Sequence, residues 1–143
     1  MNTQDGIALT GKLTISLNDE IVQEVDNLVV TAGKEWVAAR MKNTSTVMTH
    51  MAIGTGTNAA AIGNTTLQTE NARVALTTSG GTVAGAVITF ATTIAAGTGT
   101  GAVTEAGILN ASSTGTMLAR TVFSVVNKGV LDTMTISWAV TIS

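Results

Sequence analysis

Residues 133–142 read Thr-Met-Thr-Ile-Ser-Trp-Ala-Val-Thr-Ile, and they are the clearest guide to the fold. Every second residue is apolar: Met134, Ile136, Trp138, Val140 and Ile142. Successive side chains of a β-strand point to opposite faces, so a period of two predicts a strand with one buried face. We therefore expect this strand to place its apolar face in a core or in a subunit interface.

The same alternation recurs earlier in the chain. Further strands are predicted at residues 7–17, 21–30, 47–53, 73–78, 83–94, 103–109 and 117–126. Turn residues separate these segments at spacings of about 8–12 residues, which is typical of a sandwich or barrel. Proline is absent, so no residue interrupts the backbone donors that strand pairing needs. We predict an all-β fold, an antiparallel β-sandwich or jelly-roll-like barrel of about eight strands.

One short helix is predicted at residues 31–42. Thr31 is placed to cap it, and Glu35 is expected in its first turn, where a negative charge suits the helix dipole. Trp36, Val37 and Met41 would share one face. Residues 54–71 show no clear period and are expected to form a long ordered loop with a helical turn at 66–70.

We expect residues 7–143 to form a single domain and residues 1–6 to form a flexible, polar arm. The N-terminus lacks the basic and apolar regions of a signal peptide, and no run reaches the roughly 20 apolar residues of a membrane helix.

The composition argues against several classes of function. Charged residues make up 11% of the chain against about 25% in an average domain, and the formal net charge is −2. Nucleic-acid binding needs clustered cations to neutralise phosphates, and single-strand binding also needs aromatic side chains on which bases stack. Here the cations are scattered and the aromatic residues are few, so we expect no nucleic-acid partner. Cysteine is absent, which excludes disulfides and thiolate metal sites.

The candidate chemical motifs are each better explained structurally. His50 is the one histidine and lacks a nucleophile motif, so we interpret it as a strand residue and expect no enzyme activity. The acids at 19, 20, 24 and 26 fit no metal-loop template, and we interpret them as a solvated hairpin. Two Gly-Thr-Gly motifs, at 54–56 and 97–99, do not lead from a strand into a helix as a phosphate loop must, so we expect strand connections and no cofactor.

Glu105 and Arg120 lie in apolar surroundings, and Arg73 stands with Glu70 at the start of a predicted strand. A charge buried there costs several kcal/mol unless it is paired. We predict a structural ion pair joining Glu105 to Arg120 or to Arg73. A catalytic role for the carboxylate is the weaker alternative, because no second acid is near in sequence.

Three stretches carry a resemblance to a known group of proteins. They are residues 51–57 with Leu67 and Glu70-x-x-Arg73, then residues 98–110 with the core Thr-Glu-Ala-Gly-Ile, and then residues 115–123 with Ala-Arg-Thr. Together they resemble small virion structural proteins of tailed bacteriophages, over residues 30–143. Similar chains serve as capsid decoration (cement) proteins and as tail-fibre-like proteins.

The resemblance implies a protein of the capsid surface that binds the major capsid protein and staples neighbouring subunits. A dimer or trimer would suit a symmetric capsid site, and no membrane partner is expected. The alternative is a tail-fibre or adhesin component that binds a host glycan or a tail adaptor, although a fibre protein would usually be longer. The candidate interface residues are Asn2, Thr3, Gln4, Asp5, Gly54, Thr55, Gly56, Gly97, Thr98, Gly99 and Trp36.

Overall fold

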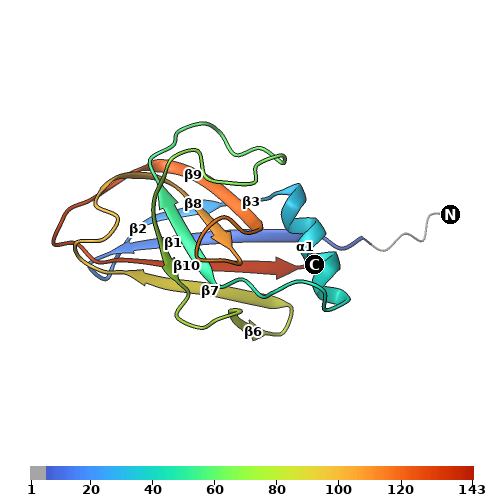
Figure 1. The fold of residues 1–143 in the computed structure, drawn as a ribbon. Helices are drawn as coiled ribbons and strands as arrows, with labels where there is room; N and C mark the ends of the chain where they lie inside the picture. The colour runs from blue at the N-terminus through green and yellow to red at the C-terminus, as the bar shows by residue number, and fades with distance from the viewer. Residues whose placement is uncertain (1–5) are drawn as a thin grey trace.

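The structure is a computed structural model that describes residues 6–143. Within these residues the chain forms ten strands and one helix (Figure 1). In chain order they are β1 Leu9–Leu17, β2 Glu20–Asp26, β3 Leu28–Val29, α1 Thr31–Met41, β4 His50–Gly54, β5 Glu70–Ala75, β6 Thr82–Ala84, β7 Val87–Ile94, β8 Gly101–Leu109, β9 Met117–Lys128 and β10 Met134–Ile142.

The strands form two antiparallel five-stranded sheets that pack as a sandwich. Sheet A has the order β2-β1-β10-β7-β6, and sheet B has the order β3-β9-β8-β4-β5. The all-β prediction is therefore confirmed. β10 lies in the middle of sheet A, paired with β1 on one side and β7 on the other. This central place explains its strict alternation, because one face of the strand is buried against sheet B from Met134 to Val140.

The core fills the space between the sheets. From β10, Met134, Ile136 and Trp138 are inaccessible to solvent and Val140 is 2% exposed, whereas Ile142 at the strand end is 44% exposed. Facing residues of sheet B complete the core, and they include Met51, Ile53, Val103, Ala106 and Ile108.

A second apolar cluster covers the outer face of sheet B. It consists of Val30, Ala52, Leu67, Leu109 and Met117. The loop of residues 55–69 lies over this face and supplies Leu67 to the cluster (Figure 1). Sheet B is thus buried on both faces at β8, where every residue from Val103 to Leu109 is buried.

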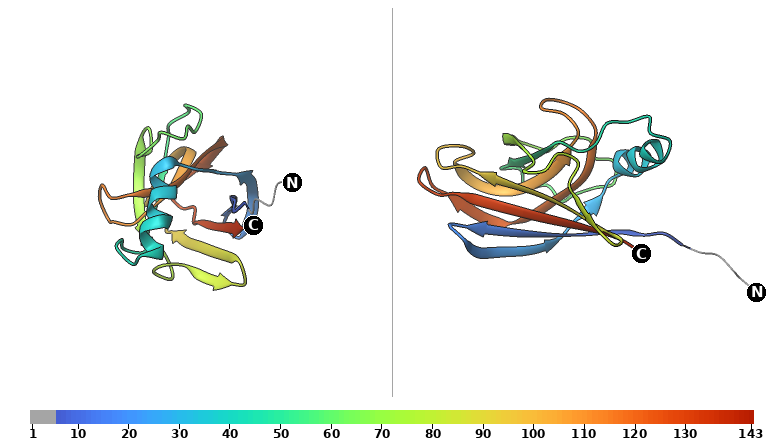
Figure 2. Two further views of the ribbon diagram at one scale, coloured as in Figure 1. Left: turned by 90° about the vertical axis from the view of Figure 1, so that its right-hand side faces the viewer. Right: turned by 90° about the horizontal axis from the view of Figure 1, so that it is seen from below.

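The two ends of the sandwich differ. At one end, called here the helix end, Leu9 pairs with Ile142 and α1 lies across the opening between the sheets (Figure 2). At the other, called here the hairpin end, Leu17 pairs with Met134, and the turn at Asn18–Asp19 joins β1 to β2. Asn18 and Asp19 have φ values of 51° and 68°, a conformation that short polar side chains tolerate best.

Several local expectations were wrong. Residues 83–94 form two strands, β6 and β7, because Gly85, at a φ of 58°, turns the chain between them. Residues 66–69, where a helical turn was expected, contain none. The connection from β5 to β6 crosses from sheet B to sheet A.

The helix also differs in detail from its prediction. It begins at Thr31, so Val30 takes the capping position and provides no side-chain hydrogen bond, and Glu35 lies beyond the first turn. Trp36 and Val37 pack against the core, whereas Met41 is 87% exposed.

No helix among residues 6–143 is long and apolar enough to cross a membrane.

Candidate functional site

Glu105 lies on the outer face of β8, under the loop of residues 55–69, and its side chain has no solvent exposure. Its Oε2 accepts hydrogen bonds from the backbone N–H groups of Gly56 and Thr69, at 2.7 and 2.8 Å. Its Oε1 accepts one from the N–H of Gln68 at 2.8 Å. Both carboxylate oxygens are therefore occupied by structural donors before any ion pair is considered.

Arg120, on the neighbouring strand β9, completes the environment of this carboxylate. Its Nε and Nη2 each lie 3.1 Å from Oε1 of Glu105. The remaining donors reach the loop, with the carbonyls of Asn58 and Ala59 and the Oδ1 of Asn64 as acceptors. The guanidinium thus makes four hydrogen bonds, and its Nη2 also forms the ion pair with Oε1 of Glu105. The pair holds the loop to the sheet, and every polar atom of the two side chains has an internal partner.

Gly54 and Gly56 are buried beside this carboxylate, so the expectation that they form an accessible interface is not met. A Cβ on Gly56 would lie 2.2 Å from Oε2 of Glu105, and one on Gly54 would lie 2.3 Å from the carbonyl oxygen of Thr69. These glycines let the backbone approach the carboxylate closely. Thr55, between them, is exposed.

Arg73 does not contact Glu105 and pairs with Glu70 instead. Its Nη2 and Nε lie 2.7 and 3.1 Å from the two carboxylate oxygens of Glu70. Its Nη1 donates to the carbonyls of Ala111 and Thr114. Of the two partners that the sequence allowed for Glu105, the structure therefore selects Arg120, and Arg73 secures the connection between β8 and β9 to the start of β5.

A further polar network ties together the connections at the hairpin end, and no sequence pattern indicates it. The Nζ of Lys128, which is 1% exposed, donates to the carbonyls of Ala95 and Asp132. The carboxylate of Asp132 accepts from the Asn18 side chain and from the backbone N–H of Gly129. These hydrogen bonds hold the pKa of Asp132 below its ordinary value, and the one from Asn18 has the largest effect.

Two apolar side chains project from this network. Val130 and Leu131 form the turn between β9 and β10, and they are 63% and 86% exposed. Gly97 and Thr98, two of the expected interface residues, are exposed in the connection that follows β7 at the same end, and Gly99 is half-buried against Ile53. The hairpin end thus presents a firmly held surface with an apolar tip.

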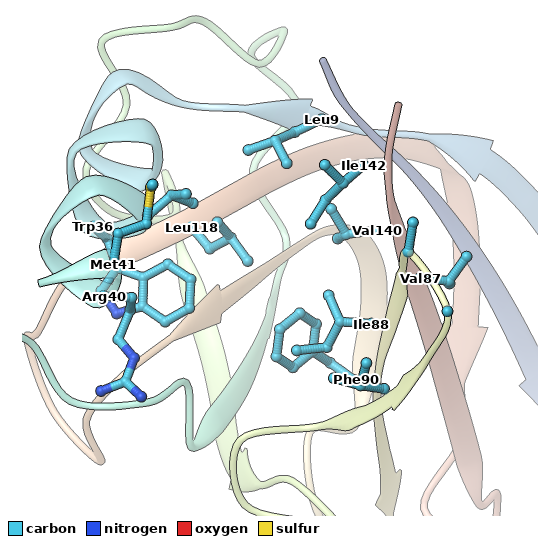
Figure 3. Close-up of a pocket in the computed structure, with 14 residues that line it drawn as sticks. Leu9, Trp36, Arg40, Met41, Val87, Ile88, Phe90, Leu118, Val140 and Ile142 are labelled. Carbon is cyan, nitrogen blue, oxygen red and sulfur yellow. The ribbon is translucent and has the colours of Figure 1, made fainter. Parts of the chain in front are cut away.

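The helix end carries an apolar pocket of about 390 Å³ (Figure 3). α1 forms one wall with Trp36, Val37, Arg40 and Met41. The strands form the rest, with Leu9, Val83, Gly85, Ala86, Val87, Ile88, Phe90, Leu118, Val140 and Ile142. The indole N–H of Trp36 donates to the carbonyl of Thr46, so the ring is fixed as a wall of the pocket. Arg40 is the charged residue of the lining, and its guanidinium bonds to Asn43 and Ser45.

The remaining candidates are dispersed. His50 begins β4, and its Nδ1 lies 2.8 Å from the hydroxyl of Thr49. The acids of the first hairpin are exposed, and residues 6–143 contain no group of three side chains placed to hold a metal ion. The expected interface residues Asn2, Thr3, Gln4 and Asp5 lie outside the described residues.

Comparison with protein-family models, curated proteins and solved structures finds no match to this chain.

Proposed function

We propose that this chain is a structural protein of a tailed-bacteriophage virion, which binds the outside of the assembled capsid and stabilises it. The phage assignment rests on the sequence resemblance over residues 30–143. The mode of action rests on one structural observation: large apolar side chains remain exposed at both ends of a sandwich whose buried ionic groups are all committed to internal partners.

Exposed apolar side chains gain free energy when another protein surface covers them, at about 25 cal/mol per Å² of area removed from water. At the hairpin end, Val130 and Leu131 are exposed and available for such a contact. At the helix end, Met41 and Val83 are available in the same way, and they are 87% and 69% exposed. With 11% charged residues, the chain has little charge to keep such surfaces apart. Binding by area and complementarity therefore fits this molecule better than a reaction at a single centre.

The Glu105–Arg120 pair contributes by fixing the loop of residues 55–69. Its carboxylate and guanidinium bind six loop residues between them, so the exposed side chains of the loop, such as Thr55 and Thr57, are presented without further ordering. A surface that is ordered before binding loses less conformational entropy on association. We propose this loop as a contact with the capsid protein.

The N-terminal segment of residues 1–6 is a second proposed contact, on its polar sequence alone. Several such segments on one oligomer would add avidity without tight binding by any one of them. Deleting residues 1–6 should then weaken binding to capsids. Full-strength, stoichiometric binding by the truncated protein would remove the segment from the mechanism.

The location can be tested by immunogold electron microscopy of virions produced from the phage genome that encodes the chain. An antibody against the purified protein should label heads over their whole surface. Label confined to tails would favour the alternative of a tail-fibre or adhesin component. A particle without label on either part would contradict the virion assignment.

A further inference from the structure

The two ends of the sandwich carry different apolar features. The hairpin end carries a protruding turn, Val130–Leu131, and the helix end carries the apolar pocket below α1. The register places them at opposite ends of the same central strands, because β1 pairs with β10 from Leu9–Ile142 at the pocket to Leu17–Met134 beside the turn. The turn and the pocket of one molecule therefore cannot meet each other.

The turn is held in a fixed conformation. The backbone N–H of Asp132 donates to the carbonyl of Gly129, and the N–H of Gly129 donates to the carboxylate of Asp132. The two apolar side chains lie between these bonded residues and point away from a network that Asn18 and Lys128 anchor. A preorganised apolar tip of this kind loses little entropy when a pocket receives it.

The charges beside the two features are opposite in sign. α1, which forms a wall of the pocket, carries the cations Lys34 and Arg40 against the single acid Glu35, and the cation Lys42 follows it directly. At the hairpin end the acids are Asp19 and Asp132 in the connections and Glu20 at the start of β2, and the cation there, Lys128, is buried on two carbonyls. Opposite charge at two surfaces favours their encounter and fixes its orientation.

We infer that copies of this chain bind head to tail, with the Val130–Leu131 turn of one copy inserted in the α1 pocket of the next. The pocket volume of about 390 Å³ lies within the roughly 300–1,000 Å³ of sites that enclose small apolar groups. Met41, Val83 and Ile142, at 87%, 69% and 44% exposure, form an apolar rim that the second copy would cover.

This contact joins two different surfaces and is therefore heterologous. Heterologous contacts build rings where the rotation closes and open chains where it does not. A ring of three copies would be the expected trimer. An isologous dimer cannot form through these surfaces, because the contact joins the turn of one copy to the pocket of the next. It concerns contacts between copies of the chain and does not depend on which part of a virion the protein occupies.

Two variants separate the two halves of the contact. Leu131→Lys places a cation on the tip, opposite the basic helix, and leaves the pocket intact. Val83→Asp places an acid on the pocket rim, opposite the acidic end, and leaves the tip intact. Ile62→Lys is the matched control, because Ile62 is 61% exposed and lines neither feature.

The mass of each protein is measured by light scattering over a wide range of concentration, after circular dichroism has shown that each variant is folded. The wild type and Ile62→Lys should rise above the 14.4 kDa of the monomer as concentration increases. Leu131→Lys alone and Val83→Asp alone should stay at the monomer mass. An equal mixture of those two should form a dimer, because one retains a pocket and the other a tip.

A wild type that stays monomeric at every concentration would overturn the inference. So would a mixture that fails to dimerise. Self-association of Leu131→Lys alone or of Val83→Asp alone would overturn it as well, because an isologous contact through one surface survives a charge placed on the other. Loss of association in Ile62→Lys would show that any added charge disperses the protein. Leu131→Ser and Val83→Ser repeat the test if a charged variant does not fold.

Discussion

Glu105 and Arg120 show why a charged pair is kept inside a protein that has few charges. Burying both ions costs several kcal/mol per ion, and the gain repays this cost only where the geometry and the additional hydrogen bonds are good. Here the carboxylate accepts hydrogen bonds from three backbone N–H groups and from Arg120, and the guanidinium donates three more to the loop. The pair acts as an anchor for a loop that has little apolar surface of its own.

This anchor is tested by a double-mutant cycle with Glu105→Gln and Arg120→Met. Each single change leaves a buried charge without its partner and should cost about 3–5 kcal/mol of unfolding free energy. The double variant removes both charges and should cost less than the sum. Unfolding free energies from urea titration provide the measurement, and strict additivity would contradict a direct pair.

Trp138 gives a second prediction at the scale of single residues. Its side chain has no solvent exposure at the centre of β10, so Trp138→Ala should cost about 3–5 kcal/mol in unfolding free energy. Ser137→Ala, at the adjacent exposed position, is the control and should change it by less than about 0.5 kcal/mol. Equal melting temperatures for the two variants would show that β10 is not packed as described.

At this scale the sequence could predict that Glu105 needs a partner, because an acid between apolar strand residues is costly wherever it lies. It could not choose between Arg120 and Arg73. That choice depends on the register of β8 with β9, where Gly107 pairs with Arg120, and on backbone donors from a loop without periodicity. Lys128 gave no signal, because its acceptors are carbonyl groups, which every residue has.

Among the elements, the loop of residues 55–69 depends most on individual glycines. Gly56→Ala should destabilise the protein, because the new Cβ would lie 2.2 Å from the carboxylate of Glu105 and 2.5 Å from the Cβ of Gln68. Gly63→Ala is the matched control in the same loop, where a Cβ meets no atom within 4 Å. The control should leave stability unchanged or raise it by about 0.4–1 kcal/mol, since alanine restricts the unfolded chain.

The comparison is made by thermal unfolding of the two variants. Gly56→Ala should melt well below the wild type and Gly63→Ala at or above it. Similar melting temperatures for Gly56→Ala and the wild type would show that the loop is not held closely against Glu105.

The connections at the hairpin end should make stability depend on pH. Hydrogen bonds lower the folded-state pKa of Asp132 from the ordinary value of 3.8. The Asp132 carboxylate therefore makes its full contribution to the free energy of unfolding at a pH above its ordinary pKa. This contribution is lost as the pH falls through the lowered pKa, because the unfolded state takes up the proton first. The difference in unfolding free energy between the wild type and Asp132→Asn should shrink on acidification. A difference that stays constant from neutral to acid pH would contradict the role of the carboxylate.

Strands with strict alternation could be predicted well, and the connections between them less well. β10 was recognised within a residue of its bounds because a central strand with one buried face leaves a complete period-two pattern. Residues 83–94 were not divided correctly, because Gly85-Ala86 is small and apolar and does not interrupt that pattern. Sheet membership depends on contacts between distant segments, which a local pattern does not contain.

For the molecule as a whole, the two sheets pack as one sandwich with different surfaces at its two ends. The buried ionic groups have partners inside the sandwich, whereas large apolar side chains are exposed at both ends. The proposed binding to other protein subunits would remove these apolar side chains from water. The exposure of Gly97 and Thr98 in a strand connection could be predicted from sequence, whereas the pocket could not, because it combines α1 with five strands.

Binding to empty, mature capsids of the phage that is proposed to encode the chain tests the proposed function most directly. Capsids are sedimented with increasing amounts of the purified protein, and the bound protein is quantified, with purified tails as the parallel sample. We predict saturation at a fixed number of copies per capsid, together with a rise in the temperature at which the capsids disrupt. Absence of binding to capsids, or binding to tails alone, would contradict the proposal.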